Sequence, residues 1–85
     1  MAYQEIIKYL KNLANPDIAM HSQRFFKTGK GQYGEGDIFL GIRVPILRKS
    51  IKQFRETSLA DIQRLLKSEY HEVRLFSLLL LVHQF

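Results

Sequence analysis

The fold of this chain is decided by its last apolar stretch, Tyr70-His71-Glu72-Val73-Arg74-Leu75-Phe76-Ser77-Leu78-Leu79-Leu80-Leu81-Val82-His83-Gln84-Phe85. One face at helical spacing holds Val73, Phe76, Leu79 and Leu80, and further apolar residues, Leu75, Leu78, Leu81 and Val82, cover most of the remaining circumference. A helix that is apolar all round needs neighbours all round. The sequence ends at Phe85 without a polar closing turn or a C-cap glycine. We therefore expect a helical array that continues beyond this segment.

Working outward from this stretch, we predict about five helices, near residues 3–14, 16–28, 45–55, 59–68 and 70–84. Asn15-Pro16-Asp17 predicts the start of the second, because asparagine caps a helix, proline suits its first turn and aspartate favours its positive end. Ser58 and Asp61 resemble a capping box at the start of the fourth.

The apolar positions of these helices recur at three- and four-residue intervals. In the third predicted helix, Leu47, Ile51 and Phe54 form a buried stripe, while Arg48, Lys52 and Arg55 fall on a different face. In the first, second and fourth predicted helices, the expected inward positions are Tyr3, Ile6, Ile7, Leu10, Leu13, Ala14, Ile18, Ser22, Phe25, Phe26, Leu59, Ile62, Leu65 and Leu66.

These patterns predict an all-α fold of antiparallel helix pairs joined by short connections. Units of about 40 residues with an uncapped apolar end are typical of an α-solenoid, in which each repeat buries its face only against the next. We interpret residues 1–85 as a single N-terminal segment of such a helical-repeat domain. Its partners would be the remaining repeats of a longer protein, and self-association through the last helix is a second possibility.

The composition restricts the class of protein. Hydrophobic residues make up 46% of the chain, which is too apolar for disorder, and cysteine is absent, which excludes disulfides and cysteine-based metal sites. The longest uncharged stretch, 75–85, has 11 residues, whereas a membrane-spanning helix needs about 20. The first residues carry no secretory signal. We expect a cytoplasmic protein without a membrane span.

The positive charge lies in one third of the sequence. Of the net charge of +5, residues 20–55 carry +6, from eight lysines and arginines against Glu35 and Asp37. Such a concentration of charge predicts an anionic partner, although a merely solvated basic face is the alternative.

Two partial motifs are present, but neither supports a site, so we predict no cofactor and no metal. Residues 29–34 match G-x-G-x-x-G, but a helix precedes them and the glycine-rich loop 29–43 follows, so the dinucleotide interpretation fails. The loop is either a hinge or a place where Lys30 meets a phosphate backbone. His71-Glu72 begins H-E-x-x-H, but Leu75 occupies the second histidine position. We predict no catalytic residue in this chain.

Several strings resemble the N-terminal region of the AlkD-like DNA alkylation repair family. They are Asn15-Pro16-Asp17, Arg24-Phe25-Phe26-Lys27, Phe39-Leu40-Gly41-Ile42 followed by Pro45 and Arg48, and His71-Glu72-Val73-Arg74-Leu75-Phe76. The resemblance implies HEAT-like helical repeats whose concave basic surface holds duplex DNA. It also implies that the full-length protein excises alkylated purines such as 3-methyladenine or 7-methylguanine.

The resemblance also indicates which parts of the function this segment carries. The family's catalytic tryptophans and aspartate come from later helices, and this chain has no tryptophan, so we expect it to be inactive alone. The expected DNA-binding residues are Arg24, Phe25, Lys27, Lys30, Arg43, Arg48 and Lys52. Two alternatives are a protein-interaction scaffold without catalytic activity and a basic helix lying on an anionic membrane.

Overall fold

The computed structural model describes residues 2–25 and 38–84. Within these ranges the chain forms five α-helices and no strand, which confirms the all-α prediction for this part of the protein. The helices are α1 (Ala2–Asn12), α2 (Pro16–Phe25), α3 (Val44–Ser50), α4 (Leu59–Leu66) and α5 (His71–Gln84), and a 3₁₀ helix, η1 (Ile51–Phe54), continues α3.

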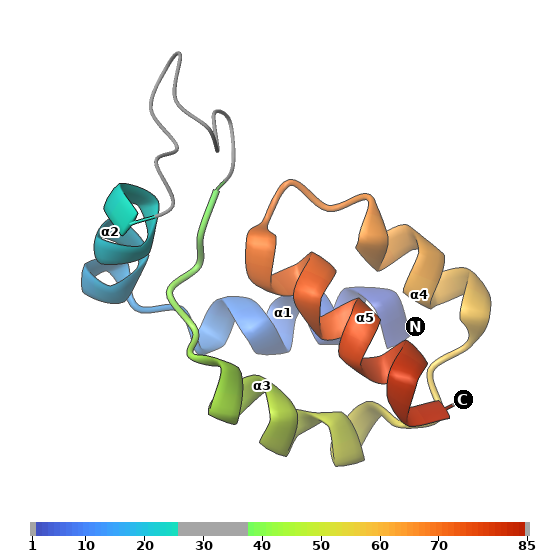
Figure 1. Ribbon diagram of the computed structural model, residues 1–85. Helices are drawn as coiled ribbons and strands as arrows, with labels where there is room; N and C mark the ends of the chain where they lie inside the picture. Colours follow the sequence, from blue (N-terminus) through green and yellow to red (C-terminus); the bar gives the residue numbers. More distant parts are fainter. Residues whose placement is uncertain (1, 26–37, 85) are drawn as a thin grey trace.

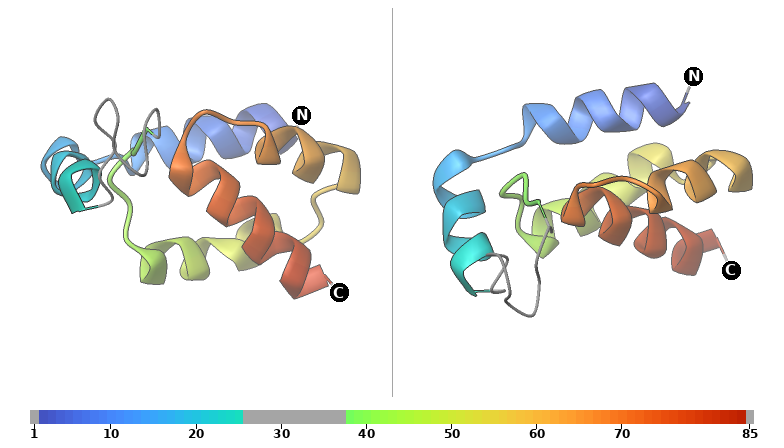
Figure 2. Two further views of the ribbon diagram at one scale, coloured as in Figure 1. Left: turned by 45° about the horizontal axis from the view of Figure 1, so that its top comes forward. Right: turned by 90° about the horizontal axis from the view of Figure 1, so that it is seen from above.

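Helix α5 is central to the packing. It contacts α4, α3 and η1, while α1 packs against α4. Helix α2 stands at one end of the molecule, apart from the other helices (Figures 1 and 2). In the described part of the chain, no helix is long and apolar enough to cross a membrane.

The core is built from the faces that the apolar spacing predicts. Its fully buried side chains are Ile6, Leu10, Leu47, Ile62, Leu65, Val73, Phe76 and Leu80. Phe54 packs edge-on between two other rings, with centroids 5.3 Å from Tyr9 and 6.1 Å from Phe76. Leu59 departs from the prediction: it starts α4 and is 51% exposed, so the buried face of that helix begins one turn later.

Both predicted helix caps are present. The Asn15 side-chain oxygen accepts hydrogen bonds from the backbone N–H groups of Asp17 and Ile18, at 3.0 and 3.2 Å. The Ser58 hydroxyl accepts one from the N–H of Asp61 at 3.2 Å. These bonds satisfy donors that the first turn of a helix otherwise leaves without a partner.

The third predicted helix, 45–55, is not continuous. The α-helix ends at Ser50, whose hydroxyl donates to the Ile46 carbonyl oxygen (2.9 Å) and also shares a hydrogen bond with the Tyr9 hydroxyl (3.0 Å). A serine that bonds to the carbonyl four residues earlier often bends a helix. In the 3₁₀ turn that follows, residues three apart share a face, which keeps Ile51 and Phe54 together on the core side.

The predicted loop 29–43 is only partly described. Residues 29–37 lie outside the described part, but residues 38–42 form a non-helical segment, here called the strut. Phe39, Leu40 and Ile42 of the strut are buried, so this part of the predicted loop belongs to the interior.

Candidate nucleic-acid interface

The rod formed by α3 and η1 presents cations to solvent. Arg43 is the N-cap residue of α3, in an extended conformation (φ −78°, ψ 149°), and its side chain is exposed. Arg48 and Lys52 are exposed further along the rod, whereas Leu47 and Ile51 are buried in the core. The sequence therefore correctly separates a cationic side of this element from an apolar side.

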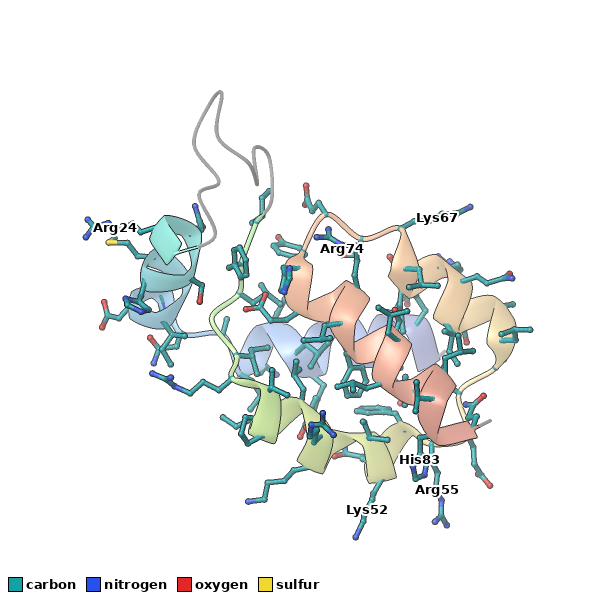
Figure 3. All side chains as sticks on the ribbon, in the orientation of Figure 1. Arg24, Lys52, Arg55, Lys67, Arg74 and His83 are labelled. Carbon is teal, nitrogen blue, oxygen red and sulfur yellow. The ribbon has the colours of Figure 1, made fainter. Side chains whose placement is uncertain are left out.

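Two further basic residues lie beside Lys52. Figure 3 shows Lys52, Arg55 and His83 gathered where η1 approaches the end of α5, all pointing away from the core. Lys52 and Arg55 stay together because residues three apart share a face of a 3₁₀ turn. His83 lies in the last turn of α5, where a basic group is favoured by the helix dipole. Arg55 and His83 were not among the expected DNA contacts. The helical spacing places Arg55 on one face with Lys52, whereas His83 joins them through the packing of α5 on η1 (Figure 3).

Arg24 does not join this group. It is exposed in the last turn of α2, with its Nη2 4.0 Å from the Met20 sulfur, and it points away from the body of the molecule on a different side from Lys52 (Figure 3). Phe25 ends α2, and its side chain lies outside the described part, as do Lys27 and Lys30 entirely. A charged run that is continuous in sequence is thus divided between two elements of the fold.

A third basic region lies on the opposite edge. Lys67 and Arg74 are on the far side of the molecule from Lys52 (Figure 3). Arg74 donates from Nη1 to the Ser68 carbonyl oxygen at 2.9 Å, so it stabilises the turn before α5. Lys67 is exposed at the end of α4 and serves as a positional control for the rod.

The strut is bound at its centre by one carboxylate. Glu72, in the first turn of α5, is only 3% exposed. Its Oε1 accepts a hydrogen bond from the Leu40 N–H (2.8 Å), and its Oε2 accepts bonds from the N–H groups of Gly41 (2.9 Å) and Ile42 (3.2 Å). Three donors compensate for the cost of burying a charge.

The ends of the strut are attached to two helices. At one end, the His71 N–H donates to the Ile38 carbonyl oxygen (2.7 Å), and the His71 ring stacks on Phe39 with centroids 4.5 Å apart. Further along, the Asn15 N–H donates to the Leu40 carbonyl oxygen (2.9 Å), just before α2. The strut therefore joins the start of α5 to the start of α2.

The strut and the residues that bind it coincide with the strings that carried the family resemblance. A family model described as DNA alkylation repair enzyme matches residues 6–85. The chain belongs to this family. No curated protein matches it, and no solved structure does.

In this DNA alkylation repair family member, the string Phe39-Leu40-Gly41-Ile42 has a structural role. Phe39 stacks on His71, and the next three residues donate to Glu72. The string is thus explained by contacts with the start of α5, where the string His71-Glu72-Val73-Arg74-Leu75-Phe76 also contributes to the resemblance.

Glu72 is the residue that sequence reasoning missed. In the sequence Glu72 belongs to an incomplete zinc motif and to one of the strings that carry the family resemblance, and neither predicts which groups its carboxylate binds. The available signal was a glutamate in the first turn of a helix that is otherwise apolar on every side. Across residues 2–25 and 38–84, no group of three or more His, Cys, Asp or Glu side chains is placed to hold a metal.

Proposed function

We propose that this family member binds the phosphate backbone of duplex DNA through the solvent side of the α3–η1 rod. The observation that carries the proposal is the exposure of Arg43, Arg48 and Lys52 along one element whose other side is buried. Phosphate contacts require charge and reach, and they position a protein on DNA without reading its sequence. Arg55 and His83 would extend this basic side toward the end of α5.

Arg24 and the residues that follow it would supply a second contact. Arg24 lies in the last turn of α2, Phe25 ends that helix, and Lys27 and Lys30 follow in the sequence. Because α2 stands apart from the rod, these residues would reach a different part of the duplex. This division favours a long DNA surface over a compact phosphate site.

For the longer protein, we propose excision of alkylated purines such as 3-methyladenine or 7-methylguanine in the cytoplasm. Membership of the DNA alkylation repair enzyme family supports repair, and the resemblance to AlkD-like proteins supports this class of substrate. We also propose that residues 1–85 are the N-terminal part of a HEAT-like α-solenoid of antiparallel helix pairs. Further repeats would then supply the catalytic tryptophans, which this sequence lacks.

A duplex titration at two salt concentrations tests the binding proposal. If three phosphates are contacted, the affinity should fall about 40-fold between about 50 and 200 mM salt, because each contact contributes about 0.9 to the logarithmic slope. Arg43→Glu combined with Arg48→Glu should weaken binding and reduce this slope. Arg43→Glu alone is compared with Lys67→Glu, which changes the net charge by the same amount at the opposite edge (Figure 3) and should have a much smaller effect.

The results that contradict the proposal are equally definite. Absence of binding at low salt, or equal losses for Arg43→Glu and Lys67→Glu, would exclude a specific role for the rod. Release of a methylated base by the 85-residue chain would instead contradict the proposal that it is inactive alone.

A protein-interaction scaffold is the second candidate, because α5 has apolar side chains in contact with solvent. Leu78 is 48% exposed and Val82 is 76% exposed, one turn apart on the same helix. They would bind another repeat, another protein or a second copy of this chain. Sedimentation of Leu78→Glu and Val82→Glu beside the unmodified chain tests self-association, and salt-sensitive binding to random duplex separates this function from DNA binding.

A further inference from the structure

We infer that Glu72 is a positioning residue for the DNA interface: it acts through the strut to place Arg43 for contact with a phosphate. The inference rests on the proposed function. Glu72 is a buried acid on α5, outside the α3–η1 rod, and it would nevertheless contribute to the affinity for an anionic ligand.

The strut is held to Glu72 along its whole centre. Both oxygens of Glu72 are used, and the three N–H groups that they accept from belong to consecutive residues, 40 to 42. Hydrogen bonds to a charged acceptor are stronger than neutral ones, and a buried N–H that loses its acceptor bears the full cost of desolvation. The backbone from Leu40 to Ile42 is therefore held in a single conformation.

The backbone that Glu72 binds leads directly into Arg43. Arg43 directly follows Ile42, whose N–H is the last of the three donors. On the other side, the Arg43 carbonyl oxygen accepts hydrogen bonds from the N–H groups of Ile46 (3.0 Å) and Leu47 (3.3 Å), which begin α3. The main chain of Arg43 is thus fixed from both directions, so less conformational freedom is lost when its guanidinium binds a phosphate.

The strut is also hydrogen-bonded to the residue that precedes α2. The Leu40 carbonyl oxygen accepts from the Asn15 N–H at 2.9 Å, and the Asn15 side chain caps α2. A pocket of about 150 Å³ lies between Ser22 of α2, Val44 of α3 and Leu75 of α5, and Glu72 and the strut also line it. The strut therefore contacts the start of α2, the helix that carries Arg24 at its other end.

The sign of one substitution separates positioning from simple electrostatics. Glu72→Gln removes a negative charge while keeping the size of the side chain. If only the overall charge mattered, the variant would be more positive and would bind DNA more tightly. If Glu72 positions Arg43, the variant should bind more weakly, because an amide NH₂ group would face at least one strut N–H and release that part of the backbone.

The experiment is a double-mutant cycle on the full chain, with labelled random duplex at low salt. Arg43→Ala alone should weaken binding on the order of fivefold and lower the salt slope by about one phosphate. In the Glu72→Gln background, the same substitution should cost less than about twofold, because the released arginine already contributes little. Lys52 lies on η1, beyond the strut, so Lys52→Ala should weaken DNA binding by the same factor in the unmodified chain and in the Glu72→Gln variant.

Two further measurements keep the test independent of folding defects. Circular dichroism should show unchanged helix content in Glu72→Gln. In the unmodified protein without DNA, the amides of Leu40, Gly41 and Ile42 should exchange with solvent as slowly as those of the core helices. Fast exchange at these amides would overturn the inference without the use of any variant. Glu72→Asp, which retains the charge but shortens the reach, should behave as Glu72→Gln does.

The outcomes distinguish the two proposals. If the unmodified chain does not bind duplex, or if Arg43→Ala and Lys52→Ala have no effect, the proposed function fails and the positioning role fails with it. If those variants weaken binding but Glu72→Gln tightens it, or if its effect and that of Arg43→Ala are independent, only the positioning role is overturned.

Discussion

Gly41 lies directly against the main chain of Asn15. A β-carbon added at Gly41 would stand 2.0 Å from the Asn15 carbonyl oxygen and 2.7 Å from the Ala19 nitrogen. These two atoms are joined by a 2.9 Å hydrogen bond in the first turn of α2, and Gly41 has a φ of +88°. The start of α2 therefore packs on a residue that cannot carry a side chain.

Replacing this glycine should be strongly destabilising. Gly41→Ala combines a left-handed backbone, which costs about 1–2 kcal/mol for an L-residue, with a clash against main-chain atoms. We expect a loss of at least about 2 kcal/mol, which lowers the Tm of a domain this size by roughly 10 °C or more. Thermal unfolding by circular dichroism measures it. Gln53→Ala, at an exposed position, is the control and should change stability by less than about 0.5 kcal/mol.

The cap of α4 gives a second prediction. Ser58→Ala removes the acceptor for the Asp61 N–H and should cost about 1 kcal/mol. Ser58→Asp supplies another acceptor at the same position, so it should retain most of the stability. Denaturant midpoints of the three proteins test this expectation. Equal losses in both variants would mean that the hydroxyl acts through something other than capping.

The Tyr9–Ser50 hydrogen bond gives a third. Tyr9→Phe keeps the ring that packs on Phe54 but removes the hydroxyl that lies 3.0 Å from the Ser50 oxygen. The expected cost is about 1 kcal/mol in the free energy of unfolding. The double variant Tyr9→Phe/Ser50→Ala leaves neither hydroxyl without its partner. Its loss in the free energy of unfolding should therefore be smaller than the sum of the losses of the two single variants. Additive losses would show that the two groups do not interact in solution.

The stacked rings of Phe39 and His71 give a fourth. Their centroids are 4.5 Å apart with the planes inclined by 29°, an arrangement whose coupling is about 0.5–1.5 kcal/mol for aromatic pairs. A double-mutant cycle with Phe39→Leu and His71→Ala measures this coupling by urea unfolding. A coupling near zero would mean that burial alone, and not the contact between the rings, explains the role of Phe39.

The local signals in the sequence predicted most of the helical framework. Asn15 and Ser58 were recognised as caps because capping depends on residues only a few positions apart. The buried faces followed in the same way from spacing, as for Val73 and Phe76. The change from α-helix to 3₁₀ helix after Ser50 was missed because a serine inside a helix does not always bond back to the carbonyl four residues earlier, so the residue type alone does not predict it.

The candidate site was predicted less completely than the fold. Charge counting indicated the cations of the rod, but it also implied that Arg24 and Lys52 share one surface, and the fold places them on different sides. Its position in a largely apolar helix marked Glu72 as unusual, but its three partners are 30 to 32 residues away and could not be predicted. The meaning of a buried acid depends on tertiary contacts, which no local pattern contains.

The sequence distance between Glu72 and its partners also affects folding during synthesis. At about 5–20 residues per second, a ribosome makes Glu72 roughly 2 to 6 s after residues 40 to 42, whereas helices form within microseconds. Docking of the strut must therefore follow synthesis of the first turn of α5, because the N–H groups of residues 40 to 42 have no carboxylate acceptor before Glu72 is made. The hydrogen bond from Asn15 to the strut is thus completed on a backbone that only the start of α5 can fix.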